Sequence, residues 1–402
     1  MPARRACRRV LRRSSHAWAG EQRGDFIESG PWLRAQWYWQ DGETDWLQSV
    51  SREVRTVRMA VGVCDVSTLG KIDVQGPDAA AFLDRLYANT MSTLGVGRVR
   101  YGLMLREDGH VFDDGTVTRL EAERFLVTTT TANAAKVMQH MEFVHQWLSP
   151  DLDLTIVSVT EQWAQFSIAG PNSRDVLAKV VDAGHDLSNS ALPHMAARSV
   201  TVLGGLPARL FRISYSGELA YELAVAAGHG DRLVRELMAA GRVHGIAPYG
   251  TEALGVLRIE KGHVAGNEMN GQTTARDLGL GRLASSKKDY IGRAMAMRPG
   301  LLDPARPALV GLKPIDRTQR LRAGAHLIAP GAVPSLESDE GYVTSVAYSP
   351  MLGHWIGLAL LANGPARQGE RIRVWDPVRS ADFLAEVTSP VFYDPTGGRQ
   401  HG

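Results

Sequence analysis

Hydrophobic and polar positions repeat along this chain with two different periods. Between Trp46 and Met59 the apolar residues Val50, Val54 and Val57 recur at helical spacing, which predicts an amphipathic helix. The same criterion predicts helices from Pro77 onward and over residues 132–148, 171–181, 231–244 and 251–262.

A period of two marks the strands. Ile72 and Val74 alternate with polar residues, as in a half-buried strand, and the turn at 107–109 joins segments 101–105 and 111–117 as a hairpin. Further strands are predicted over residues 125–130, 154–160, 163–169, 208–214 and 219–225. Short strands in irregular alternation with helices predict an α+β fold with antiparallel sheets.

The pattern changes after Lys313 and Pro314, where proline and glycine become frequent and helical periodicity fades. Strands over residues 307–312, 341–348, 356–361 and 371–375 predict a C-terminal all-β barrel. Three prolines between 298 and 307 mark a linker. We therefore expect a tail with an aromatic docking segment at 1–45, a two-lobed domain at 46–300 and the barrel at 301–402.

Composition narrows the class of protein. The 402 residues are 44% hydrophobic and contain no run of 18 apolar residues, so we expect no transmembrane helix. The net charge of +2 argues neither for nor against nucleic acid, and we expect neither a membrane nor a nucleic-acid partner. Cys7 and Cys64 make no disulfide framework and fit a reducing cytoplasm. The six arginines among the first 13 residues favour a basic tail or a mis-assigned start over a transit peptide.

Familiar nucleotide and metal motifs are missing. The sequence has no G-x-G-x-x-G and no phosphate-binding P-loop, so it predicts no nicotinamide or flavin site of the usual kind. His140 and His145 would lie about 140° apart on a helix, and no metal site is predicted.

Five words in order carry a family resemblance: VGVCDVSTLGKIDVQGPDAAAFLDRL, YGLMLREDGHVFDDGTV, FSIAGPNSRDVL, FRISYSGELAYEL and YGTEALGVLRIEKGH. Together they resemble the glycine-cleavage T-protein (aminomethyltransferase) family, whose members bind folate, from about residue 51 to 390. The resemblance implies two α+β lobes and a barrel around a central folate cavity, with residues 46–300 as the folate-binding domain.

Other words narrow the resemblance. STLGKI replaces the T-protein's SHMGKI, and SSKKDYIGRAMAMRP, LVGLKPID, GYVTSVAYSPMLG and WLRAQWYW are similar to the C-terminal half of the alpha subunit of heterotetrameric sarcosine oxidases. In that family the complete subunit also carries an N-terminal dinucleotide-binding half, which this sequence lacks. The word EKGHVAGNEMNGQTT departs from the T-protein pattern and argues against a lipoyl-bound donor.

The resemblance also implies site residues. Asp113 in VFDDG matches the family's catalytic aspartate, which would orient the folate amine and accept its proton. Asp113 and Asp114 point to opposite faces of an extended segment, so only one can line the pocket. Turn chemistry is the alternative explanation for the DDG word.

Four further residues are expected to bind the folate. Tyr215 and Glu222 match the pterin-contacting positions of Y-[ST]-G-E-x-x-[YF]-E, Arg258 matches the family's helix arginine, and Tyr101 leads the strand before the DD word. A carboxylate such as Glu222 can accept two parallel hydrogen bonds from a pterin. Tyr215 as a core residue and Arg258 as a surface residue are the alternatives.

The function implied by the resemblance is a tetrahydrofolate-binding one-carbon transferase, part of a cytoplasmic sarcosine oxidase. It would capture the methylene or formaldehyde unit from flavin oxidation of sarcosine, an N-methyl amine, as 5,10-methylenetetrahydrofolate, with the flavin on a partner subunit. A glycine-cleavage-type aminomethyltransferase, a folate-dependent demethylase and a non-catalytic folate-binding scaffold are the alternatives.

Overall fold

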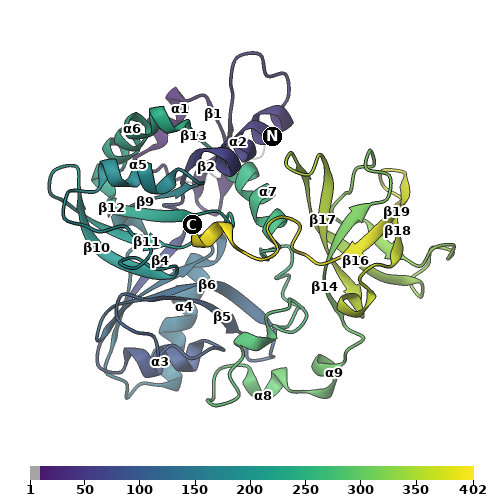
Figure 1. Ribbon diagram of the computed structural model, residues 1–402. Helices are drawn as coiled ribbons and strands as arrows, with labels where there is room; N and C mark the ends of the chain where they lie inside the picture. The colour runs from purple at the N-terminus through teal and green to yellow at the C-terminus, as the bar shows by residue number, and fades with distance from the viewer. Residues whose placement is uncertain (1–9) are drawn as a thin grey trace, which may run out of the picture.

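Two stacked sheets and a separate barrel make up the part of the chain that the computed structural model describes, residues 10–402 (Figure 1). Arg4, Arg5, Arg8, Arg9 and Cys7, on which the expectations for the N-terminal tail partly rest, lie outside these residues. Within residues 10–402 no helix has the length and apolar character needed to cross a membrane.

The first sheet has five strands, and helices cover its outer face. Its order is β5 (Val99–Leu105), β6 (Val111–Glu121), β7 (Arg124–Thr129), β4 (Gly70–Gln75) and β8 (Thr155–Ser158). Alternate apolar residues such as Ile72 and Val127 pack against Phe82 of α3 (Ala79–Leu86) and Val137 of α4 (Ala134–Phe143). A short π-helix, η2 (Val144–Leu148), extends α4.

The second sheet has six strands and a helical cover of its own. Its order is β10 (Ala196–Val202), β11 (Leu206–Arg212), β12 (Ala220–Ala226), β9 (Trp163–Ala169), β3 (Val61–Asp65) and β13 (Ile246–Pro248). Tyr221, Leu223 and Val225 share an outer core with α5 (Ser173–Val180) and α6 (Gly230–Gly241). Alternate residues on the strands therefore face the other sheet.

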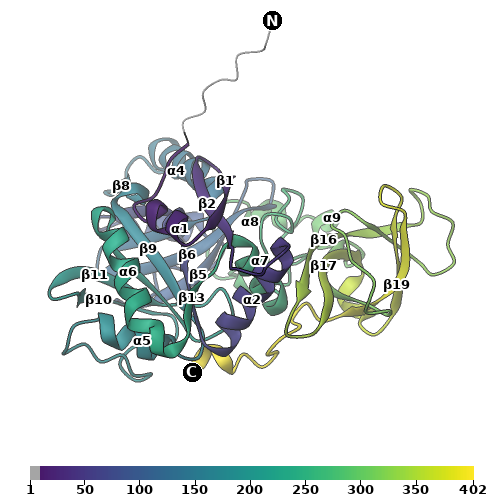
Figure 2. The ribbon, with the colours of Figure 1, turned by 90° about the horizontal axis from the view of Figure 1, so that it is seen from above.

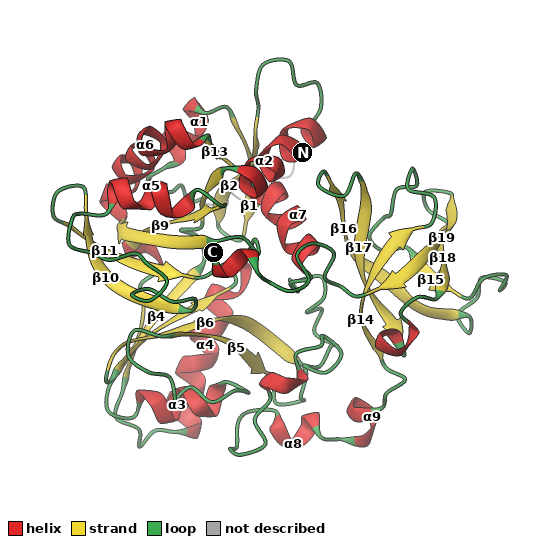
Figure 3. Ribbon diagram, viewed as in Figure 1, coloured by secondary structure: helices red, strands yellow, loops and turns green. Residues whose placement is uncertain are grey.

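The inner faces of the two sheets meet in a smaller core. Val99 and Leu126 of the five-stranded sheet pack there with Ala197, Phe211 and Ala224 of the six-stranded sheet. Both sheets thus have a helix-covered outer face and an inner face turned toward the middle of the molecule (Figure 3).

The aromatic N-terminal segment forms regular structure. It contains α1 (His16–Glu21) and a hairpin of β1 (Gly24–Ser29) and β2 (Trp32–Tyr38). Seen from above, α1 and the hairpin lie over the two-sheet body, away from the barrel (Figure 2).

Two helices occupy the space between the sheets and the barrel. Asp45 caps α2 (Trp46–Met59) by accepting a hydrogen bond from the backbone N–H of Gln48, and α2 packs against α7 (Thr251–Lys261). Their apolar side chains join Leu103 of β5 and Leu358 of the barrel in one central core, which also receives Cys64. The three bodies therefore meet around α7.

The C-terminal barrel closes on itself. Its order is β14 (Pro307–Pro314), β17 (His354–Ala362), β16 (Asp339–Ser349), β15 (His326–Ile328), β18 (Arg371–Asp376) and β19 (Ala381–Thr388), with β14 pairing both β17 and β19. Two short helices, α8 (Arg293–Ala296) and α9 (Pro299–Leu302), precede it. After β19 the chain returns to the two-sheet body and ends in a short turn, η8 (Arg399–His401).

The predicted α+β fold with antiparallel sheets and a C-terminal barrel is confirmed. The helix predicted from Trp46 to Met59 has those bounds in the structure. Strands β1, β2, β10, β13, β15 and β19 were not predicted. β10 reads AARSVTV and lacks clean alternation, the hairpin is dominated by aromatic residues, and β13 and β15 have only three residues each.

Candidate functional site

The two adjacent aspartates of β6 point to opposite faces of the five-stranded sheet. Asp113 lies opposite Met104, which belongs to the outer, helix-covered core, whereas Asp114 lies opposite Leu103, which belongs to the central core. Directly opposed residues of an antiparallel pair share a face. Asp114 therefore faces the middle of the molecule and Asp113 faces the helices.

The carboxylate of Asp113 is already engaged by the protein. The hydroxyl of Thr130 donates to it at 2.7 Å and the amide nitrogen of Asn133 at 3.0 Å. Sequence reasoning chose Asp113 as the pocket-facing carboxylate. The strand register instead turns the Asp113 side chain toward α4 and the Asp114 side chain toward the central face.

Asp114 is paired with Tyr101 on the central face. The Tyr101 hydroxyl donates a hydrogen bond to Asp114 at 2.8 Å. Burial, together with the neighbouring charge of Asp113, raises the pKa of Asp114 to about 7. Burial also raises the pKa of Tyr101, so the phenol stays a hydrogen-bond donor. A carboxylate with this pKa can take up and release a proton near neutrality.

Tyr215 and His263 form a second aromatic group beside this pair. The carbonyl oxygen of Tyr215 accepts a hydrogen bond from Nδ1 of His263 at 3.0 Å, and the ring centroids lie 5.6 Å apart. Burial lowers the pKa of His263 to about 4, so its ring is neutral with Nε2 as an acceptor. The Tyr215 side chain keeps 40% of its surface accessible, yet surrounding protein raises its pKa to about 12, in part through the charge of Asp114.

Four of these side chains are partly accessible to solvent although protein surrounds them. Tyr101, Asp114, Tyr215 and His263 are surrounded by enough protein to shift their pKa values, and each retains contact with solvent. Side chains of a closed core would retain none. These four side chains therefore lie close together and partly accessible to solvent between the two sheets and the end of α7, a place called the recess below.

Glu222 lies on the inner face of the facing sheet. It follows Tyr221, which points outward, and it sits opposite Ser167 of β9. The amide nitrogen of Gln165 donates a hydrogen bond to its carboxylate, and burial raises its pKa. The nearby ammonium of Lys71 opposes that rise, while burial lowers the pKa of Lys71 to about 7.

Arg258, the helix arginine singled out from the sequence, bridges α7 to the barrel. Its guanidinium donates to Glu268 at 2.9 Å, to the carbonyl of His263 at 3.1 Å and to Ser345 of β16 at 2.7 Å. Its charge reaches Tyr215 and offsets part of the rise that burial causes in the pKa of that phenol. These bonds make Arg258 a residue that positions the His263 segment against the barrel.

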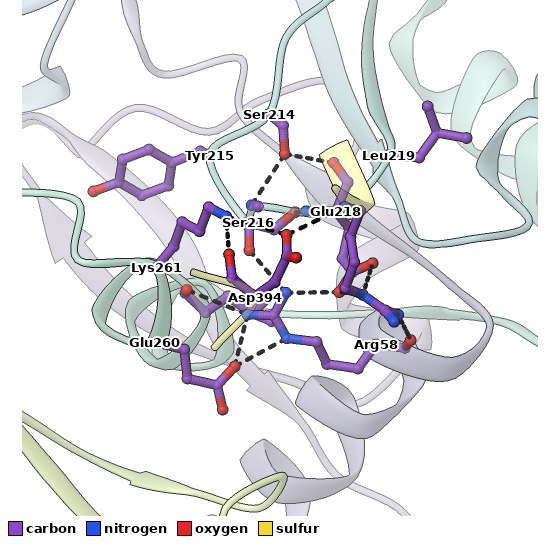
Figure 4. Close-up of polar contacts among 12 residues, drawn as sticks. Arg58, Ser214, Tyr215, Ser216, Glu218, Leu219, Glu260, Lys261 and Asp394 are labelled. Carbon is purple, nitrogen blue, oxygen red and sulfur yellow. Dashed lines mark hydrogen bonds and ion pairs between the residues drawn. The ribbon is translucent and has the colours of Figure 1, made fainter. Parts of the chain in front are cut away.

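A fully buried charge cluster supports the loop that carries Tyr215 (Figure 4). Arg58 of α2 pairs with Glu260 at 2.6 Å and Glu218 at 2.8 Å, and it also donates to the carbonyl of Ser216. Arg399, from the returning C-terminal segment, donates to Glu218 as well. Tyr215 points away from this cluster, so the charges hold the loop while its ring stays available.

Several residues of this site were missed by sequence reasoning. Asp114 was considered and placed on the other face, while Gln165, Lys71 and Arg58 gave no indication of their role. Their partners lie far away in the sequence, as with Gln165 and Glu222, so periodicity could not bring them together. Within residues 10–402 no group of three or more His, Cys, Asp or Glu side chains is arranged to hold a metal ion.

Comparisons with known proteins place this architecture in a family. A model described as the GCVT N-terminal domain matches residues 15–288, and one described as the glycine cleavage T-protein C-terminal barrel domain matches residues 308–394. The chain belongs to the glycine cleavage T-protein family. An aminomethyltransferase of Corynebacterium aurimucosum is 30% identical to this chain, and the match covers 92% of this chain and 94% of the relative.

Relatives that are longer than this chain have higher sequence identity to it. The sarcosine oxidase subunit alpha of Rhizobium meliloti is 53% identical over 388 residues, and that of Corynebacterium sp. strain P-1 is 44% identical over 393 residues. Each match covers 96% of this chain but only 39% or 40% of the relative. The chain thus spans about two fifths of the length of these alpha subunits.

A solved structure of a T-protein family member has the same fold. The aminomethyltransferase T of the glycine cleavage system from Bartonella henselae superposes with a TM-score of 0.80 over 96% of this chain and 99% of its own, at 24% identity. This likeness extends over both sheets and the barrel.

Proposed function

We propose that this chain binds tetrahydrofolate in the recess between the two sheets and loads a one-carbon unit onto it. The observation that carries the proposal is that Asp114 and Glu222 lie on the inner faces of the two facing sheets, with the ring of Tyr215 near Asp114. Membership in the T-protein family and the names of its relatives support the folate chemistry.

Glu222 is the proposed anchor for the pterin. A bound pterin presents a ring N–H and an exocyclic amine in parallel, which one carboxylate can accept together. Gln165 fixes the rotamer of Glu222 from the side, and its hydrogen bond keeps the carboxylate oriented. Tyr215 offers a flat apolar face for the ring and a hydroxyl at its edge.

Asp114 is the proposed proton carrier, in place of Asp113. Tetrahydrofolate supplies nucleophilic N5 and N10, which must lose a proton when a methylene bridge closes. The pKa of about 7 lets the Asp114 carboxylate accept that proton near neutral pH. Tyr101 orients the carboxylate through its hydrogen bond, and Arg258 keeps the opposite wall of the recess attached to the barrel.

The one-carbon donor follows from the more similar relatives. The identity with sarcosine oxidase alpha subunits favours a methylene or formaldehyde unit released by flavin oxidation of sarcosine. The remaining three fifths of such a subunit, or a separate chain, would hold the flavin. A glycine-cleavage donor is the second candidate, because an aminomethyltransferase matches over 94% of its length.

Two measurements test the proposal. Calorimetric titration of the purified chain with tetrahydrofolate should show saturable binding, and its absence would remove the assignment. With a co-expressed flavin subunit and sarcosine, Asp114→Asn should lower the yield of methylenetetrahydrofolate by about 10²–10⁴-fold. The matched variant Asp113→Asn should retain it.

The outcomes separate the rival functions. An unchanged yield for Asp114→Asn with intact folate binding would indicate a non-catalytic scaffold. Loss in Asp113→Asn alone would return the proton-handling role to that residue. Activity with an aminomethyl-loaded lipoyl carrier, and none with the flavin subunit, would indicate glycine cleavage.

A further inference from the structure

A small cavity lies under the N-terminal hairpin. It has a volume of about 30 Å³, and its walls come from Arg13, from Arg34 of β2, from Cys64 and Asp65 of β3, and from Tyr249. A water molecule needs roughly 10–15 Å³ of such volume, so the cavity holds about two oxygen-sized positions. That is the size of one carboxylate head group.

Three N–H donors in this cavity have no acceptor. Within residues 10–402, Nε and Nη2 of Arg13 and Nε of Arg34 are buried and meet no hydrogen-bond partner. Buried donors in native proteins are almost always satisfied, and an exception indicates a bound water, ion or ligand group. The protein holds both guanidinium groups in place. Arg13 stacks on Trp32 at 3.5 Å and donates to the carbonyl of Thr160 at 3.3 Å, and Arg34 donates to the carbonyl of Asp65 at 3.4 Å.

The lining of the cavity contains more cationic than anionic side chains. Arg13 and Arg34 are cationic, and Asp65 is the one carboxylate in the lining. The oxygens of Asp65 are already taken by the hydroxyl of Ser15 and the backbone N–H of Ser67. His16 adds no charge at neutral pH because burial lowers its pKa. Glu161, outside the lining, also acts on the charge of Arg13, so the case for a ligand rests on the unpaired N–H donors.

The cavity lies near Glu222 on the inner face of the six-stranded sheet. Cys64 in its wall pairs with Ser167, which in turn pairs with Glu222 on the next strand. Two strand spacings separate Cys64 from Glu222, or about 10 Å. Tyr249, another wall residue, has its hydroxyl 3.4 Å from Ser167. Both observations place the cavity beside Glu222.

We propose that Arg13 and Arg34 form a subsite for the carboxylate of a small organic acid beside the folate recess. The planar guanidinium groups match a carboxylate in shape and charge. In terms of the proposed function, which this inference extends, that carboxylate belongs either to a glycine-type amino-acid donor or to the glutamate of the folate.

The test uses the full chain and defined probes. Calorimetry measures the binding of glycine, of sodium formate and of methylamine, which has no carboxylate. The wild-type chain should bind glycine and formate but not methylamine, and Arg34→Gln should weaken carboxylate binding at least tenfold. Arg55→Gln, at an exposed arginine of α2, is the matched control and should change nothing.

A second pair of probes identifies the source of the carboxylate. Tetrahydrofolate is compared with a tetrahydropterin that lacks the aminobenzoylglutamate. If Arg34→Gln weakens only tetrahydrofolate at least tenfold, the subsite takes the glutamate. If both pterins bind as before and glycine is lost, it takes the amino-acid donor.

The proposal fails if the wild-type chain binds glycine and formate no better than methylamine and if Arg34→Gln leaves the affinity for tetrahydrofolate unchanged. The cavity then holds two ordered waters. Should Arg34→Gln not fold, Arg34→Lys, which keeps the charge and loses the fork geometry, should still weaken binding measurably. Failure of the folate assignment looks different, because glycine would then bind while tetrahydrofolate does not.

Discussion

Two buried groups of charged residues lie in the same part of this molecule and are built in opposite ways. Around Arg58 every guanidinium nitrogen donates a hydrogen bond, and both carboxylates are paired. In the recess Asp114 has a raised pKa, and in the hairpin cavity Nε and Nη2 of Arg13 and Nε of Arg34 lack acceptors within residues 10–402.

The difference separates structural charges from charges available for chemistry. A saturated cluster fixes the positions of the segments that it joins, because removing any member leaves the others unpaired. An unsaturated group lowers stability and keeps free energy available for a ligand that completes it. The Arg58 cluster holds the Tyr215 loop, and the recess beside that loop is left incomplete.

The largest effect is expected from breaking the saturated cluster. Arg58→Ala leaves Glu260 and Glu218 short of their main partner and should reduce the free energy of unfolding by about 3–5 kcal/mol. Urea denaturation measures the change. Arg55→Ala, on an exposed position of the same helix, should lie within about 0.5 kcal/mol of wild type. A decrease below about 1 kcal/mol in the free energy of unfolding of Arg58→Ala would contradict a structural role for this cluster.

Glu222 should matter for the ligand more than for the fold. Glu222→Gln replaces a charge-assisted pair of hydrogen bonds by neutral ones and should weaken tetrahydrofolate binding about 10–100-fold. Calorimetry measures the affinity, with Glu236→Gln on the exposed side of α6 as the control. Equal affinities for both variants would place the pterin elsewhere.

Removing the unsaturated carboxylate should stabilise the protein. The folded-state pKa of Asp114 is about 7, above its ordinary value of 3.8, so its contribution to stability is lost as pH rises from 4 toward 7. Asp114→Asn should therefore be more stable than wild type at pH 8, by about 1–2 kcal/mol, with no difference near pH 4. Denaturation curves at both pH values check the sign, and a destabilised variant at pH 8 would refute it.

The smallest effect concerns Tyr101. Its hydroxyl stabilises the charged form of Asp114, so Tyr101→Phe should raise the pKa of that carboxylate further. The acid limb of the pH profile for one-carbon transfer should move to higher pH by about one unit, with folate affinity little changed. A profile that does not move would mean that another group titrates.

Hydrophobic periodicity predicted the bounds and the buried face of a helix better than it predicted the contacts of that helix with distant parts of the chain. The stripe of Val50, Val54 and Val57 defines α2 and its buried side from the sequence alone. Nothing in that stripe shows that Arg58 meets Glu218 and Glu260, which are 160 and 202 positions away.

Strand register was the other limit. The sequence shows that Asp113 and Asp114 point to opposite faces, but a bulge between Met104 and Leu105 decides which face is central. Tyr101 and Glu222 were identified because they lie in recognisable words. Arg34 lies in one of those words too, yet its unpaired nitrogen depends on a hairpin that the pattern did not predict.

The segment after β19 gives the barrel a second attachment. The backbone N–H groups of Phe392 and Tyr393 donate to the carbonyl of Glu260, and Arg399 reaches Glu218. The barrel is thus joined to the rest of the chain twice. One connection is the exposed linker at 303–305 before β14, and the other is the segment after β19, which binds α7. Proteolytic cleavage of this linker would therefore give two polypeptides that stay associated through the segment after β19. Cleavage there breaks the chain without separating the barrel from the two-sheet body.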